Sequence, residues 1–186
     1  LGIETFNKRS GEVIGKGMNP DRVKEVLARL KAEWQNRVRI TAGLIVGLPH
    51  ETVQTLDDLE RYLLSDSCAL DSWVIHPLMV VEGQPSMFGQ DPGKYGYTFD
   101  RGSGKMNWRN EHMTFNDALR IAGEIRNRTE RRCQVNSWSH MRLQNLGYTE
   151  AEIDAWTVAD YFNQIDSVFA RKMQRKEDYY QKLMSV

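Results

Sequence analysis

The sequence has little cysteine, no net charge and no long apolar run, and each shortage excludes a class of protein. Its two cysteines, Cys68 and Cys133, lie far apart, which rules out a disulfide scaffold and any site built from three or four thiolates of this chain alone. The 25 basic and 25 acidic residues cancel, so no global field attracts nucleic acid or anionic lipid. No uncharged stretch reaches the roughly 18 apolar residues of a membrane span, and no signal peptide is visible. We therefore expect a globular chain with reduced thiols and a cytoplasmic location.

The first 81 residues alternate between strand-like and helix-like patterns. Three short segments read as strands, and two longer segments between them repeat their apolar side chains at helical spacing. The pattern predicts strands near 1–5, 38–46 and 72–78, helices near 20–35 and 52–65, and a turn containing Gly11, Gly15 and Gly17. Asn19 and Thr52 suit the N-cap positions of the two helices. Because helical connections join parallel strands by right-handed crossovers, we expect an α/β fold.

The composition changes after Val81. Residues 82–113 are rich in glycine and proline and predict a long loop. Within it, strands at 95–99 and 105–108 would flank a Gly-rich turn at 100–104 and form a β-hairpin. The aromatic side chains of this hairpin favour a local core, with a substrate platform as the alternative. They are Tyr95, Tyr97, Phe99 and Trp108.

The last segment, 114–186, predicts a mainly helical carboxy-terminal region. Helices would begin at Thr114, at Ser137, at Thr149 and at about Val158, the last running towards Leu183. Thr149 is followed three residues later by an acid, which is typical of a capping box. The sequence thus predicts three segments, 1–81, 82–113 and 114–186.

The segment Gly43–Thr52, which reads Gly-Leu-Ile-Val-Gly-Leu-Pro-His-Glu-Thr, is the strongest candidate for a site. A buried strand enters a turn in which Gly47 lets a ligand approach the backbone closely. Glu51 follows at the start of a helix, where a carboxylate suits the dipole and can accept hydrogen bonds from free amides. Ligands of parallel α/β proteins bind at the carboxyl ends of strands. The alternative is a plain strand–turn–helix corner.

A second segment supports the functional interpretation of the first. Gly2-Ile3-Glu4-Thr5-Phe6-Asn7 is followed by Gly15-Lys16-Gly17. In order and spacing, these segments together resemble the radical S-adenosylmethionine superfamily from the fourth strand of its barrel onward. Members often show a strand ending Gly-Ile-Glu-Ser, a Lys-Gly turn, a helix, and then Gly-x-Ile-x-Gly-Leu-Pro-Gly-Glu-Thr. The resemblance implies that 1–81 form the carboxy-terminal half of a partial TIM-type barrel.

The resemblance implies that three residues bind the methionine or ribose part of S-adenosylmethionine. Glu4 and Thr5 match the polar end of the family's fourth strand, and Lys16 matches a basic residue that pairs with the cofactor's carboxylate. The chemistry agrees, since a ligand with an ammonium and a carboxylate calls for an acid and a base. A solvated surface pair is the alternative for Glu4 and Lys16.

Four further residues complete the expected cofactor site. By resemblance, Ile45 and Gly47 match positions that pack near the adenine, and Glu51 matches the acid that ends the motif. An adenine needs a flat apolar wall with backbone access. His76, at the end of the third predicted strand, would face the barrel mouth and contact cofactor or substrate, with a structural role as the alternative.

The chain departs from the family in two places. His50 stands where the family commonly has glycine, so the turn should be less tight. The family holds a four-iron four-sulfur cluster with Cys-x-x-x-Cys-x-x-Cys, which is absent here, and two distant cysteines cannot replace it. We therefore expect S-adenosylmethionine as the cofactor, and the cluster only in a longer protein.

The opening of the chain gives a further expectation. It begins on Leu1, inside a predicted strand, so we expect a fragment that lacks the amino-terminal half of its barrel. The inward strand faces would carry apolar side chains such as Leu44 and Val74. An uncovered face and edge invite pairing, so the expected partner is the missing half or a second copy.

The leading hypothesis is a fragment of a radical S-adenosylmethionine enzyme. The resemblance implies that the intact enzyme would cleave S-adenosylmethionine reductively at the cluster and form a 5′-deoxyadenosyl radical that acts on an unknown substrate. This chain alone should be inactive.

The alternative hypothesis is a non-catalytic binding module, either a degenerate barrel half or a piece that binds RNA or protein through the basic final helix. The cations of that helix also suit a solvated helix end. An unrelated phosphate-binding α/β enzyme ranks last, since no Walker-type motif is present.

Overall fold

The computed structural model describes residues 1–17, 19–100 and 106–184. It divides into two compact units, Leu1–Thr129 and Glu130–Val186. The division places the helix that follows Thr114 with the amino-terminal unit, whereas the sequence pattern had grouped it with the helical tail. None of the helices in the described residues is long and apolar enough to cross a membrane.

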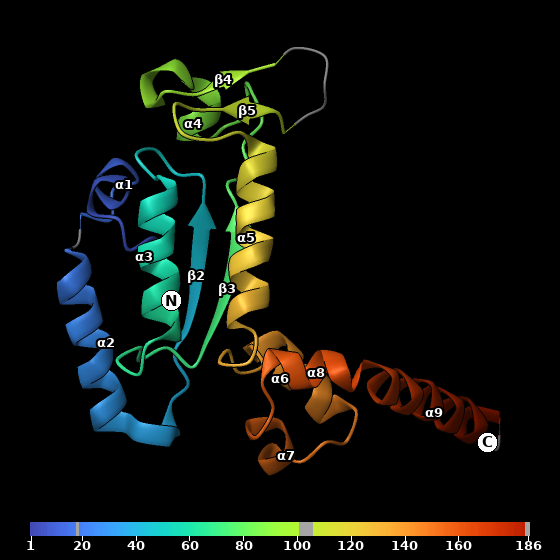
Figure 1. Ribbon diagram of the computed structural model, residues 1–186. Coiled ribbons are helices and arrows are strands. Elements are labelled where there is room, and N and C mark those ends of the chain that lie inside the picture. The colour runs from blue at the N-terminus through green and yellow to red at the C-terminus, as the bar shows by residue number, and fades with distance from the viewer. Residues whose placement is uncertain (18, 101–105, 185–186) are drawn as a thin grey trace. The chain divides into compact units, whose positions relative to one another are not determined.

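Unit 1 is built on a three-stranded parallel sheet, and the chain has a mixed α/β fold (Figure 1). The strands lie in the order β1 (Gly2–Glu4), β2 (Thr41–Val46) and β3 (Ser72–Pro77). Helix α2 (Pro20–Trp34) connects β1 to β2, and α3 (Val53–Leu64) connects β2 to β3. The parallel pairing and the bounds of these five elements confirm the predicted pattern.

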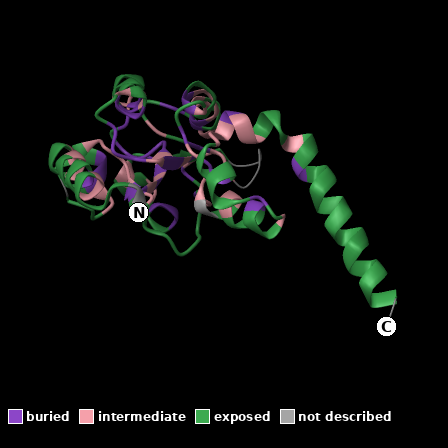
Figure 2. Ribbon diagram, turned by 90° about the horizontal axis from the view of Figure 1, so that it is seen from below, coloured by how far each residue is buried: buried purple, intermediate pink, exposed green. Residues whose placement is uncertain are grey.

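The core of unit 1 lies against one face of the sheet. Ala42, Leu44 and Val46 alternate along β2 as buried residues, and Figure 2 colours buried residues purple and intermediate ones pink. Helix α5 (Phe115–Thr129) packs against β2, β3 and α3. The helices contribute a buried stripe of aliphatic side chains: Leu27, Leu56, Leu59, Leu63, Ala118, Ala122 and Ile125. Burial of these side chains supplies most of the driving force for folding of this unit.

The other face of the sheet, called the second face below, carries Gly2, Gly43, Ile45, Val74 and His76. In the parallel register Gly2 pairs with Gly43, Gly43 with Val74, and Ile45 with His76, and paired residues point to the same side. The expectation that Leu44 and Val74 share an inward face was therefore wrong. Leu44 pairs with Ile75 and is buried on the core face. Val74 pairs with Gly43, the residue before Leu44, and successive residues of a strand point to opposite faces.

Two short helices and a hairpin fill regions that the sequence predicted as turn or loop. Helix α1 (Lys8–Val13) occupies the predicted Gly-containing turn, and α4 (Met87–Gln90) lies within the predicted loop. The hairpin is confirmed as β4 (Thr98–Phe99) paired antiparallel with β5 (Trp108–Arg109). Both strands are shorter than predicted. Residues 101–105, which cover most of the predicted turn and the start of the predicted second strand, lie outside the described residues.

The remaining elements of unit 1 are two 3-10 helices, η1 (Gln35–Arg37) and η2 (Gly93–Tyr95).

The described residues of unit 2 form four helices. They are α6 (Ser137–Asn145), α7 (Glu150–Asp154), α8 (Val158–Asn163) and α9 (Ile165–Met184). The capping box at the start of α7 is confirmed, whereas the predicted single final helix is two helices that meet at Gln164. A small cluster of buried residues forms the core: Val135, Leu143, Tyr148, Ile153 and Val168.

Candidate functional site

The strand ends of unit 1 bring an acid and a base together beside the second face. Lys16 Nζ lies 3.9 Å from Glu4 Oε1 and donates a 2.8 Å hydrogen bond to the carbonyl of Gly2. A Cβ built on Gly2 would lie 2.8 Å from Glu4 Oε1 and 3.6 Å from Lys16 Nζ. The two charged groups therefore occupy the space on the second face that the missing side chain of Gly2 leaves. Both side chains are partly exposed, 28% for Glu4 and 37% for Lys16.

Glu4 reaches this position through an unusual backbone. Its φ is +67°, in the left-handed region that non-glycine residues rarely adopt, and the register with β2 shifts between Gly2 and Glu4. Such a shift re-aims a side chain at the end of a strand. Strained backbone of this kind often accompanies function, because surrounding structure must hold it in place.

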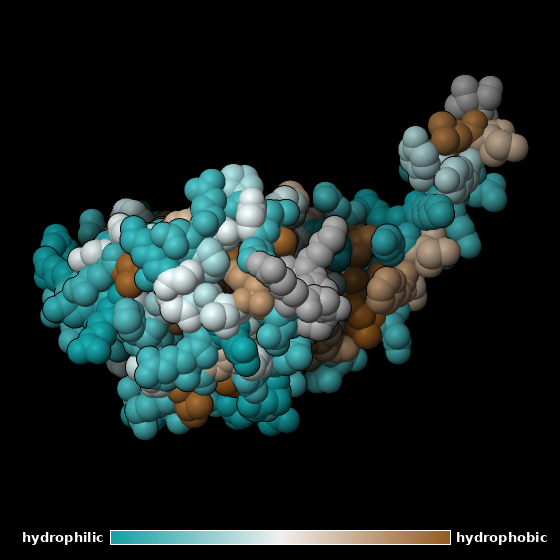
Figure 3. Space-filling view, turned by 90° about the horizontal axis from the view of Figure 1, so that it is seen from above, coloured by the Kyte–Doolittle hydropathy of each residue, from teal (hydrophilic) through white to brown (hydrophobic). Residues whose placement is uncertain are grey.

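The middle of the second face is partly open. A Cβ on Gly43 would meet no heavy atom within 4 Å among the described residues. Ile45 and Val74 are half-buried around that space, and His76 is exposed beside Ile45. This face thus offers an aliphatic surface next to an accessible imidazole. Seen from above, the end of unit 1 where β2 finishes is mainly hydrophilic, with small separate apolar patches (Figure 3).

Glu51 does not face the open part of the sheet, because it is buried in the corner between β2 and α3. Its Oε2 accepts hydrogen bonds from the backbone amides of Gly47, at 2.8 Å, and Leu48, at 3.1 Å. Its Oε1 accepts a 3.0 Å bond from the hydroxyl of Thr5. Burial raises the pKa of Glu51 from 4.5 to about 7, and it outweighs the lowering effect of the hydrogen bonds. The expected bonds to free amides are present, but their donors belong to the turn.

Thr5 also serves this corner. Besides donating to Glu51, its hydroxyl accepts a bond from the amide of Asn7. The side chain of Asn7 caps α1, and the hydroxyl of Ser10 in α1 donates a 2.6 Å bond to the carbonyl of Pro49. Together with the bond from the Asn7 side chain to the carbonyl of His50, the segment after β1 is therefore tied to the β2–α3 corner at three points. Asn7 and Ser10 were not predicted, although Asn7-Lys8-Arg9-Ser10 carries the N-cap signal that marks a helix start.

Gly47 is covered by protein. Its φ is +103°, and a Cβ there would lie 2.4 Å from the Trp108 ring. The hydroxyl of Tyr97 donates a 2.6 Å hydrogen bond to the carbonyl of Gly47, and the indole of Trp108 donates to the carbonyl of Leu78. The close backbone approach expected at Gly47 is thus made by an aromatic side chain of the hairpin. The prediction that the hairpin aromatics form a local core is confirmed for Tyr97 and Trp108, which are fully buried.

His50 does not loosen the turn. It adopts φ +65°, the left-handed conformation that glycine usually supplies, and the amide of Glu51 bonds to the carbonyl of Leu48 across the turn. The carbonyl of His50 also accepts a bond from the side chain of Asn7. The turn is thus closed across His50, and His50 itself adopts the strained conformation.

The seven predicted site residues thus divide into two groups. Glu4, Lys16, Ile45 and His76 lie on or beside the second face, where a ligand can reach them. Thr5, Gly47 and Glu51 form the buried corner that shapes the end of β2. All seven belong to the strands or the segments that follow them; Gly47 and Glu51 are buried, whereas Thr5 is half-buried.

The thiols do not fit the cluster that the resemblance implies. Cys68 and Cys133 are buried thiols outside any disulfide, Cys68 in unit 1 and Cys133 in unit 2. A cluster of this type needs three thiolates on one face of a site. The cysteines of this sequence cannot supply them.

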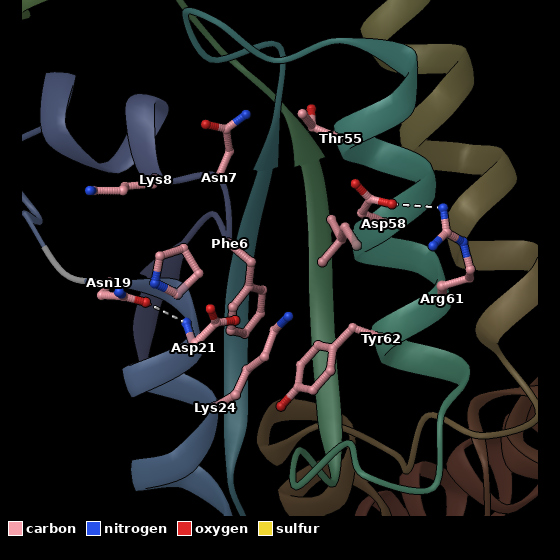
Figure 4. A pocket seen from close by; sticks show the side chains of 12 residues that line it. Phe6, Asn7, Lys8, Asn19, Asp21, Lys24, Thr55, Asp58, Arg61 and Tyr62 are labelled. Carbon is pink, nitrogen blue, oxygen red and sulfur yellow. Dashed lines mark hydrogen bonds and ion pairs between the residues drawn. The ribbon is translucent and has the colours of Figure 1, made fainter.

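Cavities also lie outside the second face. A groove of about 720 Å³ runs between the start of α2 and α3, with the segment after β1 at its floor (Figure 4). The ammonium of Lys24 stands 4.7 Å from the ring centre of Tyr62 and 5.7 Å from that of Phe6, so it already occupies the aromatic faces. A smaller cavity of about 190 Å³ lies beside the β2–α3 corner and is lined in part by His50, Lys94 and His112.

Comparisons with protein-family models, with curated proteins and with solved structures gave no match. The case for function therefore rests on the residues and geometry above.

Proposed function

We propose that unit 1 is the carboxy-terminal half of a partial TIM-type barrel that binds S-adenosylmethionine in a radical enzyme. The observation that carries the proposal is the second face, where an acid–base pair, an unfilled glycine and two aliphatic side chains share one side of a parallel sheet. In barrels of parallel strands, the face turned away from the helices lines the interior, and ligands bind at its carboxyl end.

The Glu4–Lys16 pair is suited to the amino-acid part of the ligand. A methionine moiety carries one ammonium and one carboxylate, and Glu4 and Lys16 offer the opposite charges 3.9 Å apart. The distance between the two charged groups is at the outer limit of an ion pair. A bound zwitterion can therefore replace this contact, with its ammonium beside Glu4 and its carboxylate beside Lys16. Lys16 keeps a hydrogen bond to the carbonyl of Gly2, which positions its ammonium.

The aliphatic part of the second face is suited to the adenine. Ile45 and Val74 provide an apolar wall, and the bare backbone of Gly43 leaves space between them. His76 follows on the same face and can donate to or accept from a polar group of the ligand. Small-molecule sites commonly combine such a wall with a few convergent polar groups.

When bound, S-adenosylmethionine supplies a sulfonium carbon–sulfur bond whose reductive cleavage starts the chemistry of this superfamily. The chain's own contribution is to hold and orient that molecule. Because Cys68 and Cys133 do not fit an iron–sulfur cluster, the proposal assigns the cluster to a partner, either an amino-terminal barrel half or another protein. We also propose a cytoplasmic location, in keeping with reduced thiols.

The proposal is tested by titrating the 186-residue protein with two ligands in a calorimeter. S-adenosylmethionine has the amino-acid part, whereas 5′-methylthioadenosine keeps the adenosine and lacks it. Lys16→Ala should weaken binding of S-adenosylmethionine by about 1.5–3 kcal/mol, or roughly 10- to 150-fold, because a charge-assisted contact is lost. The same variant should leave binding of 5′-methylthioadenosine unchanged.

Two further variants control the experiment. Lys8→Ala removes an exposed lysine that lies 4.0 Å from Glu12 and should change neither affinity. Gly43→Leu fills the second face and should abolish binding of both ligands. Absence of S-adenosylmethionine binding to the unaltered chain, or equal affinity of the Lys16→Ala variant, would refute the proposal.

A further inference from the structure

The hairpin of α6 and α7 in unit 2 brings an imidazole and two carboxylates together. His140 and Gln144 are four residues apart on α6, and Glu150 and Asp154 are four residues apart on α7, so each pair lies on one face of its helix. A tight connection through Gly147, at φ +87°, turns the two helices toward each other. The imidazole of His140 and the carboxylates of Glu150 and Asp154 offer three ligand atoms within 4.8 Å of one another.

One contact fixes the direction of the central carboxylate. Gln144 Nε2 donates a 2.6 Å hydrogen bond to Glu150 Oε2, and Glu150 Oε1 lies 3.1 Å from His140 Nε2. Gln144 therefore holds one oxygen of Glu150 and leaves the other directed at the imidazole. Groups that orient a metal ligand through its second oxygen are a regular part of metal sites. The His140 side chain is 13% exposed, so its ring is held in place by the surrounding helices.

The spacing is compatible with a single small cation. Zinc binds histidine nitrogen at about 2.0–2.1 Å and carboxylate oxygen at about 2.0–2.2 Å, so ligands on opposite sides of one ion lie at most about 4.2 Å apart. The three ligand atoms span up to 4.8 Å, and Glu150 and Asp154 are exposed. Binding would therefore require a small rotation of the exposed carboxylates, above all that of Asp154.

We propose that His140, Glu150 and Asp154 bind one divalent transition-metal ion, with Zn²⁺ as the preferred ion. Imidazole favours Zn²⁺ and its neighbours in the first transition row over Ca²⁺ and Mg²⁺, which prefer oxygen ligands alone. Three protein ligands leave a fourth position for water or for a group from another molecule.

The ion would link α6 to α7 in a unit with a small hydrophobic core. The buried cluster of unit 2 has five residues, among which only Leu143 and Ile153 come from α6 and α7. Small cores gain stability from a bound metal, because the folded site binds the ion more tightly than the unfolded chain does. This proposal is independent of S-adenosylmethionine binding by unit 1.

The test is a calorimetric titration of Zn²⁺ into the untagged, chelator-treated 186-residue protein at pH 7.5. The unaltered protein should bind one Zn²⁺ per chain at micromolar concentration or tighter. His140→Ala, Glu150→Gln and Asp154→Asn should each weaken that binding at least tenfold. Co²⁺ in place of Zn²⁺ should give visible absorption that His140→Ala abolishes, because the bands report the coordinating atoms directly.

A matched control separates the proposed site from an ordinary histidine–glutamate pair. His112 lies 3.8 Å from Glu111, and His112→Ala should leave Zn²⁺ binding unchanged. Equal Zn²⁺ affinity in the unaltered protein and the His140→Ala or Asp154→Asn variants would overturn the proposal, as would tighter binding of Ca²⁺ than Zn²⁺. Circular dichroism checks that His140→Ala is folded; if it is not, the exposed Asp154→Asn variant decides.

Discussion

Three donors surround the carboxylate of Glu51, yet its burial raises the pKa to about 7. Amides from Gly47 and Leu48 and the hydroxyl of Thr5 favour the charged form, but removal from water disfavours it more strongly. Glu51 is therefore a structural acid whose charge state changes near neutral pH. Its position in the corner makes the shape of the β2–α3 turn sensitive to that change.

The first prediction concerns the pH dependence of stability. The folded pKa lies above the unfolded value of 4.5, so the contribution of Glu51 is fully present below pH 4.5 and is lost as pH rises towards about 7. The loss is on the order of 3 kcal/mol, from 1.36 kcal/mol per pKa unit. Glu51→Gln should remove this pH-dependent contribution. Measured by urea unfolding, the free energy of unfolding of the variant should therefore increase relative to that of the unaltered protein between pH 5 and pH 8.

Glu12→Gln serves as the control, since that exposed side chain is 55% accessible and should show no such trend. A stability difference between Glu51→Gln and the unaltered protein that stays constant from pH 5 to pH 8 would contradict the pKa assigned to Glu51.

The second prediction concerns His50. A left-handed backbone costs a non-glycine residue roughly 1–2 kcal/mol, and glycine relieves that cost while it loses more entropy on folding. His50→Gly should therefore raise the free energy of unfolding by about 1 kcal/mol, measured by urea denaturation. His50→Ala keeps the strained backbone and should change the free energy of unfolding little. A His50→Gly protein no more stable than His50→Ala would show that the φ of +65° is not strained.

At the scale of single residues, part of the candidate site could be predicted from the sequence. The positions of Glu4, Lys16 and Glu51 relative to the strands follow from the strand and turn patterns. The direction of each side chain does not, because it depends on partners distant in sequence. Glu51 turns inward because Thr5, 46 residues away, completes its hydrogen bonds. The ring of Trp108 packs over Gly47. The sequence predicted that Trp108 belongs to a local core, but it did not predict which residue the ring contacts.

At the scale of elements, the third prediction compares Gly43 and Gly47, which lie close together in the sequence. The space beside Gly43 is open, whereas the space beside Gly47 is filled by protein. A Cβ on Gly47 would lie 2.4 Å from the Trp108 ring at φ +103°, whereas a Cβ on Gly43 would meet no heavy atom within 4 Å among the described residues. Gly47→Ala should destabilise unit 1 by about 2 kcal/mol or more, through overpacking and backbone strain. Gly43→Ala should change stability by about 0.5 kcal/mol or less.

Thermal unfolding followed by tryptophan fluorescence measures both changes. Similar melting temperatures for the Gly47→Ala and Gly43→Ala variants would contradict the placement of Trp108 over the end of β2.

The elements themselves were largely predictable in the first part of the chain. Apolar periodicity and N-caps such as Asn19 and Thr52 are local signals, and both caps are present at the predicted residues. The break at Gln164 was missed because apolar residues continue at helical spacing on both sides of it. Helix α1 was missed because Gly11 and Gly15 suggested a turn, whereas Gly11 lies inside the helix and is buried there.

At the scale of the whole molecule, the fourth prediction is self-association. A three-stranded parallel sheet with one face partly open is seldom stable by itself, since parallel sheets are normally covered on both faces. Two copies that share their second faces would cover Ile45 and Val74, so this dimer and the proposed binding of S-adenosylmethionine should compete for the same face. Light scattering should therefore show a dimer, and Ile45→Asp should shift it to monomer because a charge would enter the covered face.

Val53→Asp is the matched control, because Val53 is 62% exposed on α3 and lies away from the sheet. That variant should remain dimeric. A monomer at every concentration for the unaltered chain would contradict the prediction, and a dimer unaffected by Ile45→Asp would place the interface elsewhere.

Tyr97 and Trp108, which pack over the end of β2, also determine an order of folding. Tyr97 bonds to the carbonyl of Gly47 across 50 residues, and Trp108 bonds to that of Leu78 across 30. During synthesis the ribosome delivers the strands first, so these two carbonyls stay hydrated until the hairpin has been made. Long-range contacts of this kind form slowly because loop closure must precede them. The rim of the sheet can therefore exclude water only some time after its strands have been made, once Tyr97 and Trp108 are present.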